Sequence, residues 1–209
     1  MNDRPIALVL DNQLLFSDGI SCLLEKYADF ASSISFQCPR DLIEFLLNLE
    51  HRNCYVFLEY QLEGTNGLSV ANEIRRISRA IKIIFVTRSQ SVQVLRTIRS
   101  FMCDAILSKY SHMENLLICI QTLKNNKVYL DPRISDIINQ DQTTENILLT
   151  ARELETLTYF SKGFTIDKTA KEMFLSRNTI ISHRRNMMKK AKCSSMSQLI
   201  TLAKNMELL

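Results

Sequence analysis

The sequence of 209 residues has no apolar run that approaches the roughly 18 residues needed for a membrane span. Its first five residues lack the architecture of a secretory signal peptide. Internal repeats and low-complexity tracts are also absent. Hydrophobic content of 46% and charged content of 23% are ordinary for a globular protein. Together these features exclude a membrane protein and predict one or two soluble domains located in the cytoplasm.

Metal-binding cysteine patterns are missing as well. The sequence has six cysteines but no Cys-x-x-Cys pair, and no cluster of histidines stands beside them. A structural zinc site is therefore not expected, and reduced thiols are the expectation in a cytosol. Most of these cysteines have apolar neighbours, which is typical of small core residues. We expect neither a bound metal nor a cofactor.

Charge is distributed unevenly along the chain. From Glu145 onward there are 11 Lys and Arg residues against 6 Asp and Glu, a net charge of +5. The preceding residues carry 15 basic and 16 acidic side chains, a net charge of −1. Positive charge concentrated in the last third favours a nucleic-acid partner for that part of the chain.

Strand and helix patterns alternate over residues 1–125. The expected strands are residues 6–10, 33–37, 55–58, 81–87 and 105–107, and the expected helices are residues 14–27, 41–49, 68–77, 92–99 and 113–123. Five strand-helix units predict a doubly wound α/β domain with a five-stranded parallel sheet of the flavodoxin-like kind. In such a domain the functional residues lie in loops at the carboxyl ends of the strands.

The pattern of the remaining residues predicts a linker followed by an all-α domain. Residues 126–147 form the expected linker, with a candidate short helix around residues 133–139. Residues 148–209 predict four helices. Thr150 and Glu153 have the spacing of a capping box at the start of the first helix, and Gly163 suits its C-terminus. Ser176 is the expected N-cap of the third helix.

The segment Val56–Leu68 resembles the third strand and following loop of a response-regulator receiver domain. In that family the residue at the strand end is the aspartate that accepts phosphate, and here it is Glu59. The resemblance implies a degenerate phosphorylation pocket with no catalytic residue. Its positions are Asp11, Asn12, Glu59, Thr87 and Lys109.

Two substitutions alter the chemistry of this pocket. Asn12 stands where the family has a second acid, which removes one negative ligand for Mg²⁺. The longer arm of Glu59 misplaces the oxygen that would attack phosphate. Lys109 could instead pair with Glu59 directly and bias the domain toward one conformation without phosphate. Ile106 replaces the aromatic switch residue of the family, which further weakens a phosphorylation-driven change.

Residues 148–209 resemble the helix-turn-helix domain of the LuxR/NarL transcription factors. The resemblance rests on the capping motif, the turn glycine and the Ser-x-x-Thr-Ile-x-x-His pattern that begins at Ser176. It implies a partner, double-stranded DNA, whose major groove receives the helix after Ser176. The expected DNA-binding residues are Thr179, Ile181, Ser182, His183, Arg184, Arg185, Lys189 and Lys190.

Within this set, Arg185 is the best candidate for base readout, because guanidinium matches guanine O6 and N7. Ile181 could contact a thymine methyl group. Thr179 and His183 are expected to contact the DNA backbone or to pack. The other cations of the helix are expected to reach phosphates.

The last helix offers an apolar face for a second copy. Family members commonly dimerise through this element, so the resemblance implies dimerisation through Leu199, Leu202 and Met206. A core within the domain explains part of the same pattern, and both interpretations stay open.

The sequence as a whole favours a dimeric DNA-binding transcriptional regulator, not an enzyme, whose receiver-like domain acts without aspartyl phosphorylation. Two alternatives remain. One is a phosphorylation-responsive regulator with a non-standard acceptor. The other is a co-regulator that forms a heterodimer with a related regulator and has little DNA affinity of its own.

Overall fold

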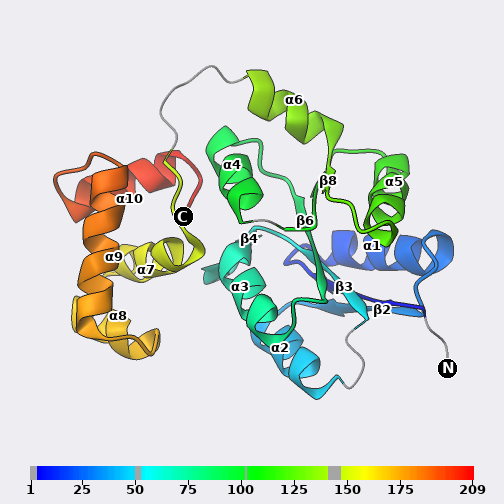
Figure 1. The fold of residues 1–209 in the computed structure, drawn as a ribbon, viewed down its shortest axis with the longest axis horizontal. Helices are drawn as coiled ribbons and strands as arrows, with labels where there is room; N and C mark the ends of the chain where they lie inside the picture. Colours follow the sequence, from blue (N-terminus) through cyan, green and yellow to red (C-terminus); the bar gives the residue numbers. More distant parts are fainter. Residues whose placement is uncertain (1–3, 50–52, 102, 141–146) are drawn as a thin grey trace.

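The computed structural model describes residues 4–49, 53–101, 103–140 and 147–209 (Figure 1). Within these residues one parallel sheet forms the centre of the N-terminal domain, in the order β2-β1-β3-β6-β7-β8. Its strands are β1 (Ile6–Leu10), β2 (Ser32–Phe36), β3 (Cys54–Leu58), β6 (Lys82–Thr87), β7 (Ala105–Ser108) and β8 (Tyr129–Leu130). A short antiparallel hairpin of β4 (Gln61–Leu62) and β5 (Thr65–Asn66) follows β3.

The prediction of five strands was wrong, because the sheet has six. Tyr129 and Leu130 lie in the segment expected as a linker, yet they pair in parallel with Ala105 and Ile106 at the edge of the sheet. The helix α6 (Pro132–Gln140) follows and packs on α4 and β7. This segment therefore extends the N-terminal domain. The remaining linker residues 141–146 lie outside the described residues.

Helices cover both faces of the sheet. The elements are α1 (Leu14–Tyr27), α2 (Pro39–Asn48), α3 (Gly67–Ile77), α4 (Val92–Ser100) and α5 (Met113–Lys124). Neighbouring strand residues belong to different core clusters, as the alternation of side chains along a strand requires. One cluster contains buried residues of α1 and α5, and the other contains those of α2, α3 and α4. The doubly wound arrangement is confirmed.

The four predicted C-terminal helices are present as α7 (Ala151–Ser161), α8 (Ile166–Glu172), α9 (Arg177–Lys190) and α10 (Met196–Asn205). Thr150 and Glu153 form the expected capping box at the start of α7. Gly163 ends this helix region with φ of +81°, a left-handed conformation that glycine adopts without strain. Ser176 caps α9 by accepting a hydrogen bond from the Thr179 N–H.

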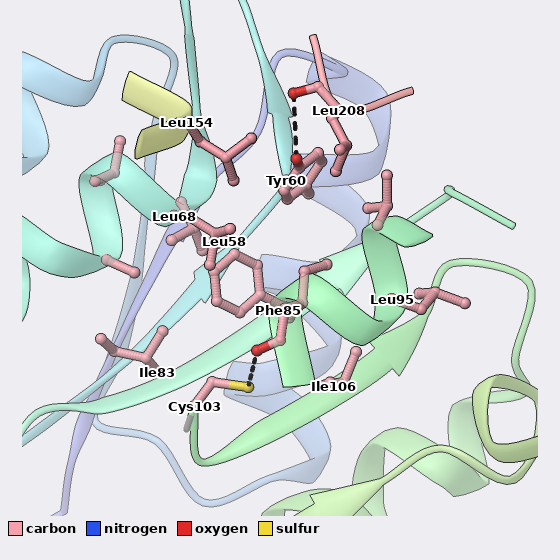
Figure 2. Packing of buried hydrophobic residues seen from close by; sticks show 14 of the residues in the cluster. Leu58, Tyr60, Leu68, Ile83, Phe85, Leu95, Cys103, Ile106, Leu154 and Leu208 are labelled. Atoms are coloured by element: carbon pink, nitrogen blue, oxygen red, sulfur yellow. Dashed lines mark hydrogen bonds between the residues drawn. The ribbon is translucent and has the colours of Figure 1, made fainter. Parts of the chain in front are cut away.

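The C-terminal domain packs on the sheet face covered by α2, α3 and α4. The buried cluster on that face, called the shared core below, contains Leu58, Tyr60, Leu68 and Phe85 from the first domain and Leu154, Leu157, Met187, Leu199 and Leu208 from the second. Figure 2 shows Leu154 and Leu208 beside the sheet residues of this cluster, with the Tyr60 hydroxyl donating to the Leu208 carbonyl at 3.4 Å. Burial raises the pKa of the Tyr60 hydroxyl, which keeps it protonated and able to donate. A second hydrogen bond joins the domains, from the Ser91 hydroxyl to the Met206 carbonyl at 2.8 Å.

The cysteines are free thiols, as the sequence predicts. Burial raises the pKa of the Cys103 and Cys119 thiols to about 12, so both stay protonated near neutral pH. In the part of the chain that the structure describes, no helix has the length and apolar character needed to cross a membrane.

Candidate functional site

The carboxyl ends of the central strands bring the predicted pocket residues to one edge of the sheet. Leu10 lies in register with Leu58, so Asp11 and Glu59 leave the sheet on neighbouring strands. On the next pair of strands Thr87 lies opposite Ser108, which places Lys109 beside them. Asp11, Glu59 and Thr87 are each at most 2% exposed.

Lys109 lies between the two acids. Its Nζ is 2.6 Å from Oδ2 of Asp11 and 3.0 Å from Oε2 of Glu59, and only 6% of its side chain is exposed. The predicted pairing of Lys109 with Glu59 is therefore present. The ammonium also donates to Oε1 of Gln13 at 3.0 Å and lies 4.4 Å from the centre of the Phe16 ring. Sequence reasoning assigned no role in the pocket to Gln13 or Phe16.

The carboxylate of Glu59 is also held by its own loop. Oε1 accepts hydrogen bonds from the N–H groups of Tyr60 at 2.6 Å and Gln61 at 3.3 Å. Oε2 faces Lys109 as an ion pair without the geometry of a hydrogen bond. A Cβ atom added to Gly67 would overlap the Glu59 carbonyl oxygen, so only glycine permits this close approach of the loop to α3.

The other two predicted positions do not join this cluster. Asn12 is exposed and lines a cavity of about 400 Å³ between the loop after β3 and the end of the chain, with Arg88 and Leu208 on its walls. The Thr87 hydroxyl accepts a hydrogen bond from the Ser89 N–H at 3.2 Å. Ile106 is buried within β7, where its side chain belongs to the shared core.

The pocket does not fit a divalent cation. Mg²⁺ needs carboxylate and water oxygens in octahedral geometry. Here the place between Asp11 and Glu59 is taken by the Lys109 ammonium. Among the described residues no group of three or more His, Cys, Asp or Glu side chains could hold a metal.

The helix α9 has one buried and one exposed face. Ile180 and Met187 are fully buried and fix the helix in its domain. Most of the predicted contact residues lie on the other side. Ile181 is 37% exposed, and Ser182, Arg184, Arg185 and Lys189 are also exposed, while Thr179 and His183 are half-buried.

Two cationic side chains of this helix form ion pairs with acids of other helices. Nε of Arg177, in the first turn of α9, donates to Oδ1 of Asp167 at 2.9 Å on the surface. Nζ of Lys190, in the last turn, lies 2.6 Å from Oε2 of Glu153. Lys190 is therefore engaged with α7, a contact that the sequence did not indicate.

The predicted dimerisation face of α10 is only partly available. Leu199 is 1% exposed because it packs in the shared core, so its assignment to a face for a second copy is wrong for this conformation. Leu202 and Met206 are half-buried against the same cluster. For these two residues dimerisation stays a prediction.

Comparisons with known proteins agree with both halves of this architecture. Residues 148–203 match the family model described as bacterial regulatory proteins, luxR family. The chain is 24% identical to the Fimbriae Z protein of Salmonella typhimurium, with 97% of each chain covered. It is 26% identical to the oxygen regulatory protein NreC of Staphylococcus epidermidis, over 97% of this chain and 98% of that protein.

Solved structures of the response regulator RcsB share the two-domain fold. RcsB of Salmonella enterica serovar Typhimurium bound to the rprA promoter superimposes with a TM-score of 0.67 and 20% identity, over 95% of this chain and 98% of that one. RcsB of Salmonella typhimurium superimposes with a TM-score of 0.60 and 19% identity, over 98% and 99% of the two chains. Residues 148–203 thus match a luxR-family domain, and the chain as a whole is similar to response regulators that join such a domain to a receiver-like fold.

Proposed function

We propose that this protein is a dimeric transcriptional regulator that binds DNA through residues 148–209 and whose receiver-like domain acts without aspartyl phosphorylation. Its similarity to luxR-family regulators supports a DNA-binding regulator and not an enzyme. Because its target is DNA, we place it in the cytoplasm. The observation that carries the proposal is the Lys109 ammonium, which fills the pocket between Asp11 and Glu59.

The contacts of the pocket argue against phosphoryl transfer. In metal-assisted transfer a cation neutralises the charge that develops on phosphate. Here one ammonium already pairs with two buried acids and balances only one of their two charges, so a phosphoryl group would enter a pocket whose lysine is engaged. The Glu59 carboxylate is also tied to the N–H of Tyr60, which restricts its reach toward an incoming group. These contacts support a receiver-like domain held in one state.

We expect no phosphate uptake when the purified protein is incubated with acetyl phosphate and Mg²⁺. The intact mass should stay unchanged, and beryllofluoride should alter neither the oligomeric state nor the affinity for DNA. The comparison variant carries Asn12→Asp and Glu59→Asp, which return two acids of the family pattern. Stoichiometric acid-labile phosphate on the unmodified protein would instead support the phosphorylation-responsive alternative.

The exposed face of α9 supports DNA recognition. A helix-turn-helix places the exposed face of its second helix in the major groove. Arg185 is exposed on this helix and has no ion-pair partner in the described part of the chain, so its guanidinium is free to meet guanine. The neighbouring Arg184 is also exposed and is assigned to phosphate.

Arg185→Ala should cost about 1–3 kcal/mol on the preferred duplex and much less on a scrambled duplex, because base contacts carry discrimination. Arg184→Ala is the matched control, since the same side chain is removed one residue away. It should weaken both duplexes alike and lower the salt slope by about one. Titration of both variants against both duplexes at several salt concentrations measures these effects. Equal losses on the two duplexes for Arg185→Ala would mean that α9 is docked differently.

Dimerisation is the second part of the proposal. Two copies bound to two half-sites gain affinity because the second contact becomes intramolecular. The half-buried Leu202 and Met206 on α10 are the residues proposed for this contact. A purified chain that stays monomeric and binds DNA only when mixed with a related regulator would favour the heterodimeric alternative.

A further inference from the structure

One ion pair joins the last turn of α9 to the first turn of α7, in addition to the packing of the buried Met187. Nζ of Lys190 lies 2.6 Å from Oε2 of Glu153. The Glu153 side chain is 5% exposed and that of Lys190 is 38% exposed. The carboxylate is thus buried, while the lysine reaches it from the edge of the domain.

One carboxylate oxygen of Glu153 also has partners in the capping box. The same Oε2 atom accepts hydrogen bonds from the Thr150 N–H at 2.8 Å and the Thr150 hydroxyl at 3.0 Å. The Glu153 N–H in turn donates to the Thr150 hydroxyl at 3.2 Å. Lys190 supplies the only cation paired with this carboxylate in the described residues. Moving the ammonium away would leave a buried charge uncompensated, which is costly in proteins.

Lys189 is the contrasting neighbour. It is exposed and has no ion-pair partner within the part of the chain that the structure describes. Its ammonium can move to a phosphate without giving up a contact. Lys190 can do so only by abandoning Glu153, and the paired charges together present little net charge to DNA.

We infer that Lys190 is a positioning residue for DNA readout, not a phosphate contact. The inference rests on the proposed function, since it concerns how α9 is presented to DNA. The other end of the helix is held by Ile180, which packs with Ala170 and Met173 of the α8 region. With both ends fixed, the angle between α9 and the rest of the domain is set. That angle decides whether Arg185 reaches the base edges.

The test compares Lys190→Met with Lys189→Met in the full-length protein. Each variant is titrated against a preferred and a scrambled duplex at several salt concentrations. Lys189→Met should lower the salt slope by about one and leave the ratio of the two affinities unchanged. Lys190→Met should leave the slope unchanged and lower that ratio about tenfold, which corresponds to the loss of one bidentate base contact.

Two results would overturn the inference. A slope that falls by about one in Lys190→Met would make this lysine a phosphate contact. Equal losses of affinity on both duplexes, at unchanged slope, would indicate a lower folded fraction and a merely structural role. Lys190→Arg should restore the affinity ratio, because a guanidinium can also pair with the carboxylate.

A third arm separates this inference from the proposed function. Glu153→Gln should reproduce the denaturation midpoint of Lys190→Met, and the double variant should unfold near the same midpoint, because either change removes the same pair. If the decrease in midpoint of the double variant equals the sum of the decreases of the two single variants, the pair is not coupled and the inference fails. The unmodified protein could bind neither duplex while the denaturation midpoints still show coupling between Lys190 and Glu153. In that case the proposed function fails and the ion pair between α9 and α7 is supported.

Discussion

Replacing Lys109 with methionine should lower the free energy of unfolding by about 3–5 kcal/mol, as expected when one partner of a buried ion pair is removed. The change leaves the carboxylates of Asp11 and Glu59, both at most 2% exposed, without the cation that lies 2.6 and 3.0 Å from them. Methionine keeps most of the side-chain volume, so the lost charge dominates the effect. Urea denaturation followed by circular dichroism measures it.

Two variants show whether the charge is responsible. The double variant Lys109→Met with Glu59→Gln should recover part of the loss, because it removes one of the two stranded charges. Lys82→Met makes the same substitution on β6, where Asp104 keeps a second partner in Arg75 at 2.6 Å. Its cost should stay below about 1 kcal/mol. Similar losses for Lys82→Met and Lys109→Met would refute the electrostatic explanation.

Phe85→Ala should cost about 3–5 kcal/mol, because a fully buried aromatic ring leaves a cavity when it is truncated. The ring lies in the shared core beside Leu58 and Leu68 (Figure 2). It also meets the Phe101 ring edge to face, with 6.4 Å between the ring centres. Denaturant titration gives the change in free energy of unfolding.

The matched control is Phe174→Ala in the turn between α8 and α9. Phe174 is 94% exposed, so the same truncation removes almost no packing and should change stability by less than about 0.5 kcal/mol. Its φ of +53° is equally unfavourable for phenylalanine and for alanine, so the backbone strain at this position is similar in the unmodified protein and in the variant. A large loss at Phe174 or a small loss at Phe85 would contradict the packing seen here.

Local sequence patterns were sufficient to predict most helices and strands, but they did not predict the two-residue strand β8. The apolar run that became β6 and the capping box at Thr150 follow from residues close in sequence. Two residues, Tyr129 and Leu130, are too few for an alternating pattern to be recognised, and they form β8 only because β7 offers an unpaired edge. Tertiary context thus supplied the sixth strand.

The candidate sites divide in the same way. The resemblance to receiver domains, together with the opposite charges, was enough to predict that Lys109 meets Glu59. The contact of Lys190 with Glu153 joins two helices, and no spacing rule relates residues that far apart in sequence. The apolar periodicity of α10 was visible, but periodicity cannot tell an internal partner from a second copy. Leu199 packs against the shared core of its own chain.

The shared core makes the two domains one thermodynamic unit. Leu154 and Leu208 bury their side chains against the first domain, so melting either domain strips apolar contacts from the other. Heat should therefore unfold the chain in a single cooperative transition. A ligand that binds only the folded form raises the melting temperature of everything that unfolds with its site. DNA held on α9 should consequently protect amide protons of the distant sheet against exchange with solvent.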